Sequence, residues 1–517
     1  MDKINILWAD DEIELLKPHI LFLKEKGYEV ATANSGDDAL DLVKEQTFDI
    51  IFLDENMPGI SGLETLVKIK QIRNDIPVVM ITKSEEEHIM EDAIGSQISD
   101  YLIKPVNPNQ ILLSLKKNLE NKRLIREKTS SAYQQEFRQI GMTLSDRLNF
   151  NEWKEVYQKL VFWELELTRT KEEGMEEILR MQKSEANTQF NKYIIHNYQD
   201  WLNGKDANAP LLSHTIFKNR VIPEIDKAET TFLVLIDNLR YDQWKVIQPL
   251  LNDYFKVDQE DLYCSILPTA TQYARNAFFA GLMPSEIEKR YPKNWLNDED
   301  EGGKNLHEEF FMQEQFKRLG KDFKTSYTKI TNLQAGKKLS DSIPNLMGNK
   351  FNVIVYNFVD MLSHARTEME VIRELADDEK AYRSITQSWL EHSPLLDIFR
   401  QISERKARLI ITTDHGTIRV TEPSKIIGDR NTNTNLRYKQ GKNLNYEKRD
   451  VFEVKNPADI YLPRQHVSSG FVFAKEDKFF AYPNNYNYYV NYYRNTFQHG
   501  GISLEEMLIP FITLSVR

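Results

Sequence analysis

The chain has almost no cysteine and no long apolar segment. Cys264 is the one cysteine among 517 residues, which excludes an internal disulfide and a cysteine-rich zinc knuckle and favours a reducing compartment. No run reaches the ~18 apolar residues of a membrane span, and no basic and apolar signal regions follow Met1. These absences predict a cytoplasmic protein without a membrane span.

Positive charge is also in deficit. Lys and Arg total 67 against 78 Asp and Glu, and the formal net charge of −11 argues against a protein that binds DNA through bulk electrostatics. Neither a helix-turn-helix nor a basic recognition helix is evident in the sequence. With 28% charged and 41% hydrophobic residues, the composition is typical of a globular protein, and the length predicts about three domains.

Short apolar runs alternate with helical periodicity over residues 1–125. Five such repeats predict a doubly wound (βα)5 domain, whose functional residues lie at the carboxyl ends of parallel strands. Polar residues stand at those ends: Asp10, Asp11, Asp54, Thr82 and Lys104. Three carboxylates at one edge would repel each other unless they hold a hard cation, so these residues predict a Mg²⁺ site. The Lys104 ammonium and the Thr82 hydroxyl suit the contacts of a phosphoryl group.

The motifs W-A-D-D-E, L-D-E-N-M-P-G and K-P, with Thr82 between the last two, resemble a response-regulator receiver domain over residues 2–125. The resemblance implies that a sensor histidine kinase is the partner and that Asp54 is the phosphorylated residue. It also implies that Asp11 and Asp54 are the main Mg²⁺ ligands.

Phosphorylation of such a domain is expected to repack one surface. A phosphoryl group held by Mg²⁺, Lys104 and Thr82 would draw Thr82 inward, and Tyr101 would turn into the vacated space. We expect the altered surface to promote a homodimer and thereby to change access to the C-terminal site.

The middle of the chain, residues 126–215, carries no chemical motif. Its apolar residues recur at a spacing of three to four, as at Trp153, Val156, Tyr157 and Leu160. This period predicts about three amphipathic helices in a small helical bundle. The loop-forming segment G-K-D-A-N-A-P at 204–210 is the best candidate for the next domain boundary.

Residues 216–517 alternate strand-like runs (TFLVLID, FNVIVYNF, RLIITTD and MLIPFITLSV) with helices, which predicts a second α/β domain with a mainly parallel sheet. Residues able to bind metal stand at strand ends or inside short motifs: Asp237, Thr271, Asp360, His364, Asp414, His415 and His499. Three carboxylates, three imidazoles and one hydroxyl are the inventory of a two-zinc phosphoryl-transfer site.

Local spacing supports this reading. Asp360 and His364 are four residues apart and share a face if their segment is helical. Asp414 and His415 are adjacent, so they point the same way only in a bent turn, which Gly416 would permit. Each residue taken singly could be structural; the full set is hard to explain without metal.

The elements D-N-L-R-Y-D (237–242), D-x-x-x-H, D-H-G and a late H-G-G resemble the alkaline phosphatase superfamily, particularly its PglZ domains. The resemblance implies one zinc on Asp360, His364 and His499. It places the other zinc on Asp237, Asp414 and His415, bridged by Thr271. A receiver, a helical middle and a PglZ domain together resemble the PorX family, regulators associated with type IX secretion in Bacteroidetes.

The nucleophile of such a site would be Thr269 or Thr271 in L-P-T-A-T-Q-Y-A-R. Thr271 is favoured because helix-forming residues follow it directly, and a helix N-terminus beside zinc stabilises an alkoxide. The alternative is that the threonine only caps the helix. The predicted activity is that of a zinc-dependent phosphodiesterase or related phosphohydrolase. The alternative is a signalling output that binds a sigma factor or a secretion component, with zinc only structural.

Two further segments bear on the substrate. Residues 425–450 carry seven Lys or Arg against three Asp or Glu, and residues 482–493 contain six tyrosines. Basic groups and stacking rings beside a phosphoryl-transfer site suit a nucleotide or a short oligonucleotide. The alternative is a long solvated loop and a tyrosine-rich pair of strands that packs on the core.

Overall fold

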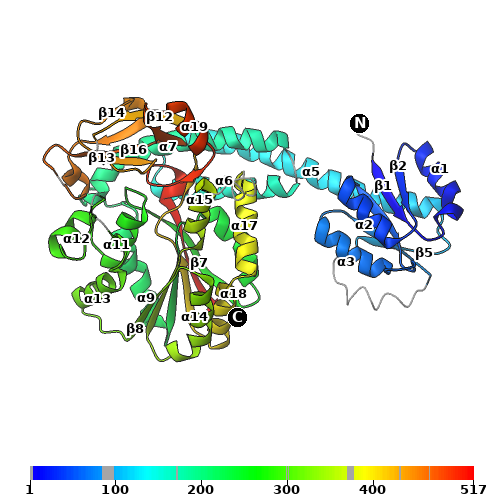
Figure 1. Ribbon diagram of the computed structural model, residues 1–517, viewed down its shortest axis with the longest axis horizontal. Helices are drawn as coiled ribbons and strands as arrows, with labels where there is room; N and C mark the ends of the chain where they lie inside the picture. Colours follow the sequence, from blue (N-terminus) through cyan, green and yellow to red (C-terminus); the bar gives the residue numbers. More distant parts are fainter. Residues whose placement is uncertain are drawn as a thin grey trace. The chain divides into compact units, whose positions relative to one another are not determined.

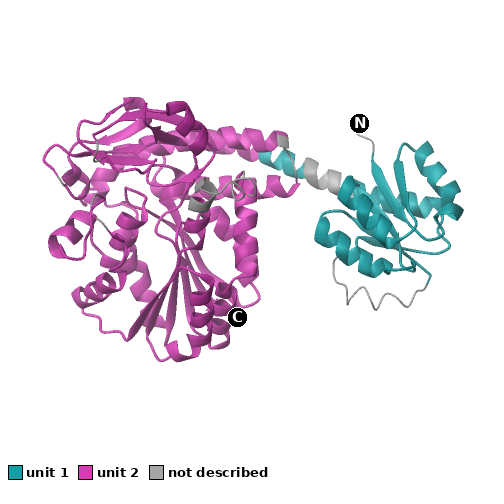
Figure 2. Ribbon diagram, in the orientation of Figure 1, with its two compact units in different colours: residues 1–133 teal, residues 134–517 magenta. Residues whose placement is uncertain are grey.

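The computed structural model divides the chain into two compact units, residues 1–133 and 134–517 (Figure 2). It describes all residues except 1–3, 84–97, 171–172, 299, 301, 369–375, 377, 430–431 and 465, and the side chains of 120–127, 173 and 364–368. The helical segment that follows residue 133 therefore belongs to the same unit as the C-terminal domain.

Unit 1 is the doubly wound α/β domain that the sequence predicts. Its parallel sheet has the order β2-β1-β3-β4-β5. The strands are β1 (Asn5–Ala9), β2 (Glu29–Ala33), β3 (Ile50–Asp54), β4 (Val78–Thr82) and β5 (Asp100–Ile103). The helices are α1 (Lys17–Glu25), α2 (Gly36–Glu45), α3 (Gly62–Ile72) and the first part of α5 (Pro108–Leu144). The helix expected between β4 and β5 lies outside the described residues.

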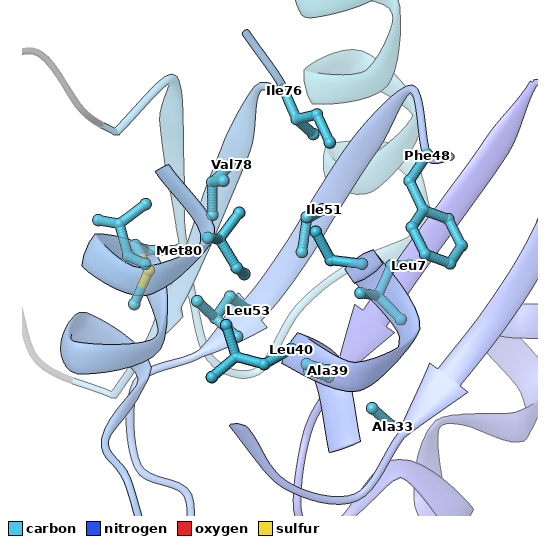
Figure 3. Close-up of a cluster of buried hydrophobic side chains, with 14 of the residues drawn as sticks. Leu7, Ala33, Ala39, Leu40, Phe48, Ile51, Leu53, Ile76, Val78 and Met80 are labelled. Atoms are coloured by element: carbon cyan, nitrogen blue, oxygen red, sulfur yellow. The ribbon is translucent and has the colours of Figure 1, made fainter. Parts of the chain in front are cut away.

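Alternating apolar side chains of the strands build the core on either face of this sheet. Figure 3 shows one face, in which strand residues meet helix α2 through Leu7, Ile51, Leu53, Val78, Met80, Ala39 and Leu40. Burying each large aliphatic side chain contributes about 1.5–3 kcal/mol. A capping box at Ser61 and Glu64 begins α3. The core thus sets the strand ends, and with them Asp10 and Asp54, at one edge of the sheet.

The middle segment forms long helices, as its periodicity predicts. They are the rest of α5, α6 (Phe150–Thr170) and α7 (Glu173–Leu202). Trp153 of α6 packs edge-on against Phe190 of α7 at 5.3 Å between ring centroids. The apolar face of α6 also packs on the C-terminal domain: the ring of Tyr157 on α6 lies 6.0 Å from the ring of Tyr241, which belongs to that domain.

The C-terminal domain is built on a six-stranded sheet of order β7-β19-β10-β6-β9-β8. Its strands are β6 (Thr231–Ile236), β7 (Phe255–Cys264), β8 (Thr325–Ile330), β9 (Phe351–Tyr356), β10 (Arg408–Thr412) and β19 (Leu508–Val516). Strands β10, β6, β9 and β8 pair in parallel, and β7 runs in the same direction, while β19 is antiparallel to both of its neighbours, β7 and β10. The four predicted strands are confirmed; β7 and β8, which carry many polar residues, were not expected.

Helices cover both faces of this sheet (Figure 1). On one side lie α9 (Ile222–Lys227), α11 (Thr271–Ala280) and α13 (Glu308–Arg318), and on the other α14 (Leu333–Leu346), α17 (Glu379–Glu391) and α18 (Pro394–Glu404). Further helices are α8 (Ser213–Ile216), α10 (Tyr241–Ile247), α12 (Pro284–Arg290), α15 (Phe358–Glu368) and α20 (Leu504–Met507). The layered arrangement leaves the carboxyl ends of the parallel strands open to converging loops.

Small sheets form a further region of the C-terminal domain between β10 and β19. Their strands are β11 (Ile418–Arg419), β12 (Glu422–Ile427), β13 (Tyr438–Gly441), β14 (Asn445–Tyr446), β15 (Val451–Val454), β16 (Gly470–Ala474), β17 (Lys478–Ala481) and β18 (Phe497–Gln498). The tyrosine-rich segment is helix α19 (Tyr486–Tyr493), so the suggestion of a strand pair there was wrong. Tyrosines four residues apart stack along that helix, an arrangement that a period of two could not produce.

Candidate functional site

The sheet topology brings the predicted metal ligands of the C-terminal domain to one edge. Strands β10, β6 and β9 are parallel neighbours, and Asp414, Asp237 and Asp360 follow their carboxyl ends. Thr271 is the first residue of α11, and His499 directly follows β18. Residues spread widely along the chain therefore gather because strand ends of one direction share an edge.

Three of these side chains form a tight cluster. Ligand atoms of Asp237, Asp414 and His415 all lie within 4.8 Å of one another, and the three residues are buried. The hydroxyl oxygen of Thr271 lies 3.0 Å from His415 Nε2. It lies 3.5 Å from Asp237 Oδ1. The cluster joins a hydroxyl at a helix N-terminus to a carboxylate and imidazole donor set that suits zinc.

A second pair lies beside the first cluster. Asp360 Oδ1 is 3.8 Å from His499 Nε2, and the rings of His499 and His415 stack at 4.2 Å between centroids. Asp360 lies on α15, so the helical segment that joint binding by Asp360 and His364 requires is present. The side chain of His364, the third predicted ligand here, lies outside the described residues.

A hydrogen bond selects the tautomer of the neutral His415 ring. Its Nδ1 lies 3.0 Å from the carbonyl oxygen of Gly416, which can only accept, so Nδ1 carries the proton. In the neutral ring Nε2 is therefore the lone-pair nitrogen, and it faces the Thr271 hydroxyl. This tautomer is the one that ligates a metal through Nε2.

The structure separates the two candidate threonines. Thr269 is fully buried; its hydroxyl donates to the carbonyl of Gly501 at 2.9 Å and accepts from the amide of Gly500 at 3.0 Å. Thr269 thus holds the backbone of the H-G-G segment. Thr271 is the threonine whose hydroxyl faces the cluster.

Arg275, one turn along α11 from Thr271, is fully buried among carboxylates. Its guanidinium pairs with Asp237, with Asp414 at 3.0 Å, and with Glu308 at 3.5 Å. Burial raises the pKa of Asp237 well above its ordinary value; Arg275 opposes this rise, and the neighbouring carboxylates add to it. Lys329 also pairs with Glu308 at 3.3 Å, and Asp360 acts on Asp237 as well. Two cationic side chains thus face four carboxylates, an excess of negative charge that favours further cations.

Close backbone contact shapes the turn that carries Asp414 and His415. The turn is not a strand, as expected. We expected Gly416 to permit this turn through its backbone freedom, but the structure gives a different reason for the glycine. A Cβ at Gly416 would lie 2.0 Å from the carbonyl oxygen of Glu505, and the Gly416 amide donates to the carbonyl of Glu506 at 3.1 Å. The glycine is required because α20 presses against the turn.

Two supporting residues were missed in the sequence. Asn238, at a φ of 65°, turns the chain after Asp237, and its amide nitrogen donates to Asp414 Oδ1 at 3.5 Å. Its side chain donates to the hydroxyl of Ser363 at 3.3 Å. The position of an asparagine directly after a strand-end aspartate was the available signal, since asparagine tolerates left-handed backbone.

The receiver residues also converge. Asp10, Asp11 and Asp54 place carboxylate oxygens within 4.8 Å of one another. Lys104 Nζ lies 3.0 Å from Asp10 and 2.9 Å from Asp54. Burial, with Asp10 nearby, raises the pKa of Asp54 despite the hydrogen bond from Lys104. The donor set fits Mg²⁺, which prefers carboxylate oxygen.

The predicted switch residues lie near this site. The Thr82 hydroxyl donates to Glu55 Oε2 at 2.9 Å, a partner that sequence reasoning missed although it directly follows Asp54. Tyr101 is half-buried and packs on the core cluster that contains Leu53 and Met80. Thr82 would have to leave Glu55 in order to contact a phosphoryl group on Asp54.

The basic and tyrosine-rich segments divide into structural and exposed residues. Arg437 is fully buried and pairs with Glu506 at 2.7 Å, and burial lowers the pKa of Lys439 to about 7. Tyr488 and Tyr489 on α19 are 64% and 39% exposed. Part of the basic segment therefore builds the fold, whereas the tyrosine helix keeps accessible rings.

Comparison with protein families matches three parts of the chain. Residues 6–116 match the response regulator receiver domain, and residues 123–202 match the PorX response regulator linker domain. Residues 216–514 match the BREX system PglZ alkaline phosphatase-like domain. Within the part of the chain that the structure describes, no helix has both the length and the apolar character needed to cross a membrane.

Curated relatives match about a quarter of the chain. The transcriptional regulatory protein ZraR of Escherichia coli is 34% identical over 140 residues, which is 27% of this chain and 32% of ZraR. The alginate biosynthesis transcriptional regulatory protein AlgB of Pseudomonas syringae is 37% identical over 120 residues, 23% of this chain and 27% of AlgB. The chain thus spans about a third or less of the length of these relatives.

Solved structures also match about a fifth of the chain. The chemotaxis protein CheY4 of Vibrio cholerae is 31% identical and covers 22% of this chain and 98% of its own, with a TM-score of 0.21. The PglZ match covers more than half of the chain, and it follows a receiver and a PorX linker in order. The chain therefore belongs to the PglZ alkaline phosphatase-like family, in the architecture of a PorX-type response regulator.

Proposed function

We propose that the C-terminal domain is a zinc-dependent phosphodiesterase that acts on nucleotides or short cyclic or linear oligonucleotides. The observation that carries the proposal is the position of Thr271. Its hydroxyl lies at the start of α11, 3.0 Å from His415 Nε2 and 3.5 Å from Asp237 Oδ1. A hydroxyl so placed beside metal ligands suits a nucleophile.

The donor set supports two zinc ions. Asp237, Asp414 and His415 would hold one, with the Thr271 oxygen. The other would be held by Asp360, His364 and His499. Bound zinc would supply Lewis acidity that favours the alkoxide of Thr271 and stabilises the leaving oxygen. The negative excess around Arg275 fits this content of cations.

The reaction would then proceed in two steps through Thr271. Thr271 attacks phosphorus in line with the leaving ester oxygen, which forms a phosphothreonine and releases the first product. Water attacks the same phosphorus from the vacated side, which frees the Thr271 oxygen and releases the second product. The N-terminus of α11 stabilises negative charge on that oxygen in both steps.

The charge of the site favours diesters over monoesters. A monoester brings about two negative charges on a terminal phosphoryl group and usually needs a cationic side chain beyond the metals. Arg275 is the nearby cation, and its guanidinium is already paired with Asp237 and Asp414. The exposed rings Tyr488 and Tyr489 suit the bases of an oligonucleotide.

The receiver would control this output, and the output would regulate type IX secretion. A sensor histidine kinase would phosphorylate Asp54 with Mg²⁺ bound at Asp10, Asp11 and Asp54. Phosphorylated receivers would then pair as a homodimer. A sigma factor or secretion component remains a candidate partner of the output domain.

Thr271→Val tests the nucleophile. The variant keeps the shape of the side chain, so we expect retained zinc content, hydrolysis of bis(p-nitrophenyl) phosphate below detection, and partial activity in Thr271→Ser. Wild-type protein should hydrolyse the bis-ester faster than p-nitrophenyl phosphate. Near-normal turnover in Thr271→Val would assign the attack to another group. Zinc binding by wild-type protein without hydrolysis of any mononucleotide, dinucleotide or cyclic substrate would favour the non-catalytic output.

A further inference from the structure

A buried network of charged side chains joins helices α6 and α7 to the segments that carry the proposed metal ligands. At its centre, Glu164 of α6 accepts hydrogen bonds from Arg383 of α17 at 2.6 Å and from Lys183 of α7 at 2.7 Å. The side chains of Glu164, Arg383 and Lys183 are 13%, 5% and 17% exposed. The central carboxylate thus ties three helices together with little contact with water.

One branch of the network runs to the Asp237 segment. Arg383 also donates to Asp242 Oδ2 at 3.1 Å, and Asp242 accepts from Arg240 Nε at 2.9 Å. Arg240 is 1% exposed and stands three residues after Asp237. The ion pairs of α6 therefore reach the loop that carries the first metal ligand.

Arg240 touches the other ligand segments as well. Its guanidinium lies 5.6 Å from the ring of Tyr382 and 5.3 Å from that of Phe497, and those two rings stack at 4.0 Å. Phe497 precedes His499 by two residues. The Cγ of Arg240 would lie 3.5 Å from a Cβ at Gly416, the neighbour of His415. One arginine thus contacts the Asp237, His415 and His499 segments.

Tyr382, which contacts Arg240, also contacts the segment that carries Asp360. Its hydroxyl donates to the carbonyl of Val359 at 3.4 Å, directly before Asp360. Thr386, one turn further along α17, accepts from Gln243 of α10 at 2.8 Å. Helix α17 therefore connects the Asp360 segment to the helix that follows Asp237.

A second branch runs from α7 to the turn at His415. Lys183 lies 3.4 Å from Glu505 Oε1, and Asn187 donates to Glu505 Oε2 at 3.0 Å. Asn187 also accepts from the amide of Leu504 at 2.8 Å. The carbonyl of Glu505 presses on Gly416. Helix α7 therefore holds α20 in place through these contacts. Helix α20 packs against the turn that carries Asp414 and His415.

These groups remain charged in the folded protein. Burial opposes ionisation of Glu164, yet Lys183 and Arg383 lower its pKa below the ordinary value. The pKa of Lys183 is raised by Glu164 and Glu505 although burial opposes this. Removing one partner would leave a buried charge without compensation, so the remaining groups and their segments would have to move.

We propose that Glu164, Arg383 and Lys183 are positioning residues, through which the packing of α6 and α7 sets the spacing of the metal-ligand segments. A shift of these helices would then change metal affinity and turnover without any contact with substrate. The effect on turnover rests on the proposed function, whereas the effect on the order of the ligand segments does not.

The test compares two single substitutions on α6 in the full chain. Glu164→Gln removes the central charge of the network. Lys154→Met removes another ion pair between α6 and the C-terminal domain, Lys154 to Asp261 at 2.7 Å, which belongs to neither branch. Three quantities are measured: amide exchange of segments 237–243 and 412–418, zinc affinity by chelator competition, and kcat and KM for the bis-ester.

We expect Glu164→Gln to speed amide exchange in both segments and to weaken zinc binding and lower kcat by about ten-fold each, with KM nearly unchanged. Lys154→Met should leave all three quantities near wild type even if the melting temperature falls. Lys183→Met, which leaves the Arg383 pair in place, should give smaller changes of the same kind and replaces Glu164→Gln if that variant does not fold.

The outcomes separate this inference from the proposed function. Wild-type exchange in the ligand segments of Glu164→Gln or Lys183→Met overturns the inference, and so do equal changes in Lys154→Met. If wild-type protein hydrolyses no ester, the proposed function fails, but faster exchange and weaker zinc binding in the network variants still support the positioning role.

Discussion

Gly416→Ala should disable the metal site through one methyl group. The new Cβ would lie 2.0 Å from the carbonyl oxygen of Glu505, whereas ordinary contact begins at 3.4 Å. Two backbone segments must therefore separate by about 1.4 Å, because neither atom belongs to a flexible side chain. The segment that moves carries Asp414 and His415, so their distances to Thr271 change directly.

The expected magnitudes follow from this displacement. Misplacement of a catalytic group by about 1 Å costs about 100-fold in rate, so we expect kcat to fall by that order. Overpacking should lower the free energy of unfolding by about 1–3 kcal/mol. Zinc affinity should fall with kcat, since His415 and Asp414 are proposed ligands of one ion.

The assay measures turnover of the bis-ester, zinc affinity by chelator competition and thermal unfolding. Gly174→Ala on α7 is the matched control, because nothing lies within 4 Å of its added Cβ. That variant should keep full activity, and its free energy of unfolding should rise by up to about 1 kcal/mol, since alanine favours the helix more than glycine does. Wild-type zinc affinity and turnover in Gly416→Ala would refute the reasoning that α20 holds the turn.

Three further predictions concern metals and the receiver. Elemental analysis should find two zinc ions per chain, and the double variant His364→Ala with His415→Ala should lose most of this zinc; less than one ion in wild-type protein contradicts the site. Beryllofluoride with Mg²⁺ should convert the protein to a dimer in sedimentation, and Asp54→Ala should abolish the change; a monomer in both states contradicts the switch. Asp54→Asn should raise the melting temperature of the receiver at pH 7 without Mg²⁺. The folded pKa of Asp54 is raised, so its protonated form stabilises the fold at low pH and that contribution is lost as pH rises through the folded pKa. The advantage of Asp54→Asn should therefore shrink in acid, and an advantage that grows in acid would contradict the sign.

The local sequence pattern alone was enough to predict where the strands end. The runs before Asp54, Asp237 and Asp414 are continuous and apolar, which is the mark of strands buried on both faces. Parallel strands end at a shared edge, so residues far apart in the chain could be assigned to one site. The helical start at Thr271 followed in the same way from helix-forming residues after it.

Other features had no local signature. Strands β7 and β8 are polar along much of their length, and they are strands because neighbours in the sheet pair with their backbones. The tyrosine run could be counted in the sequence, but its helical form became visible only in the structure.

What the sequence by itself determined was the set of chemical groups and the periodic elements that carry them, because backbone periodicity and side-chain chemistry are local properties. Only the tertiary structure decided which charges meet. It paired Arg275 with Asp237 and Asp414, placed Glu505 against Gly416, and joined Glu164 to Arg383 across 219 positions of the chain. Such contacts depend on the packing of whole helices and sheets, and no spacing along the chain encodes them.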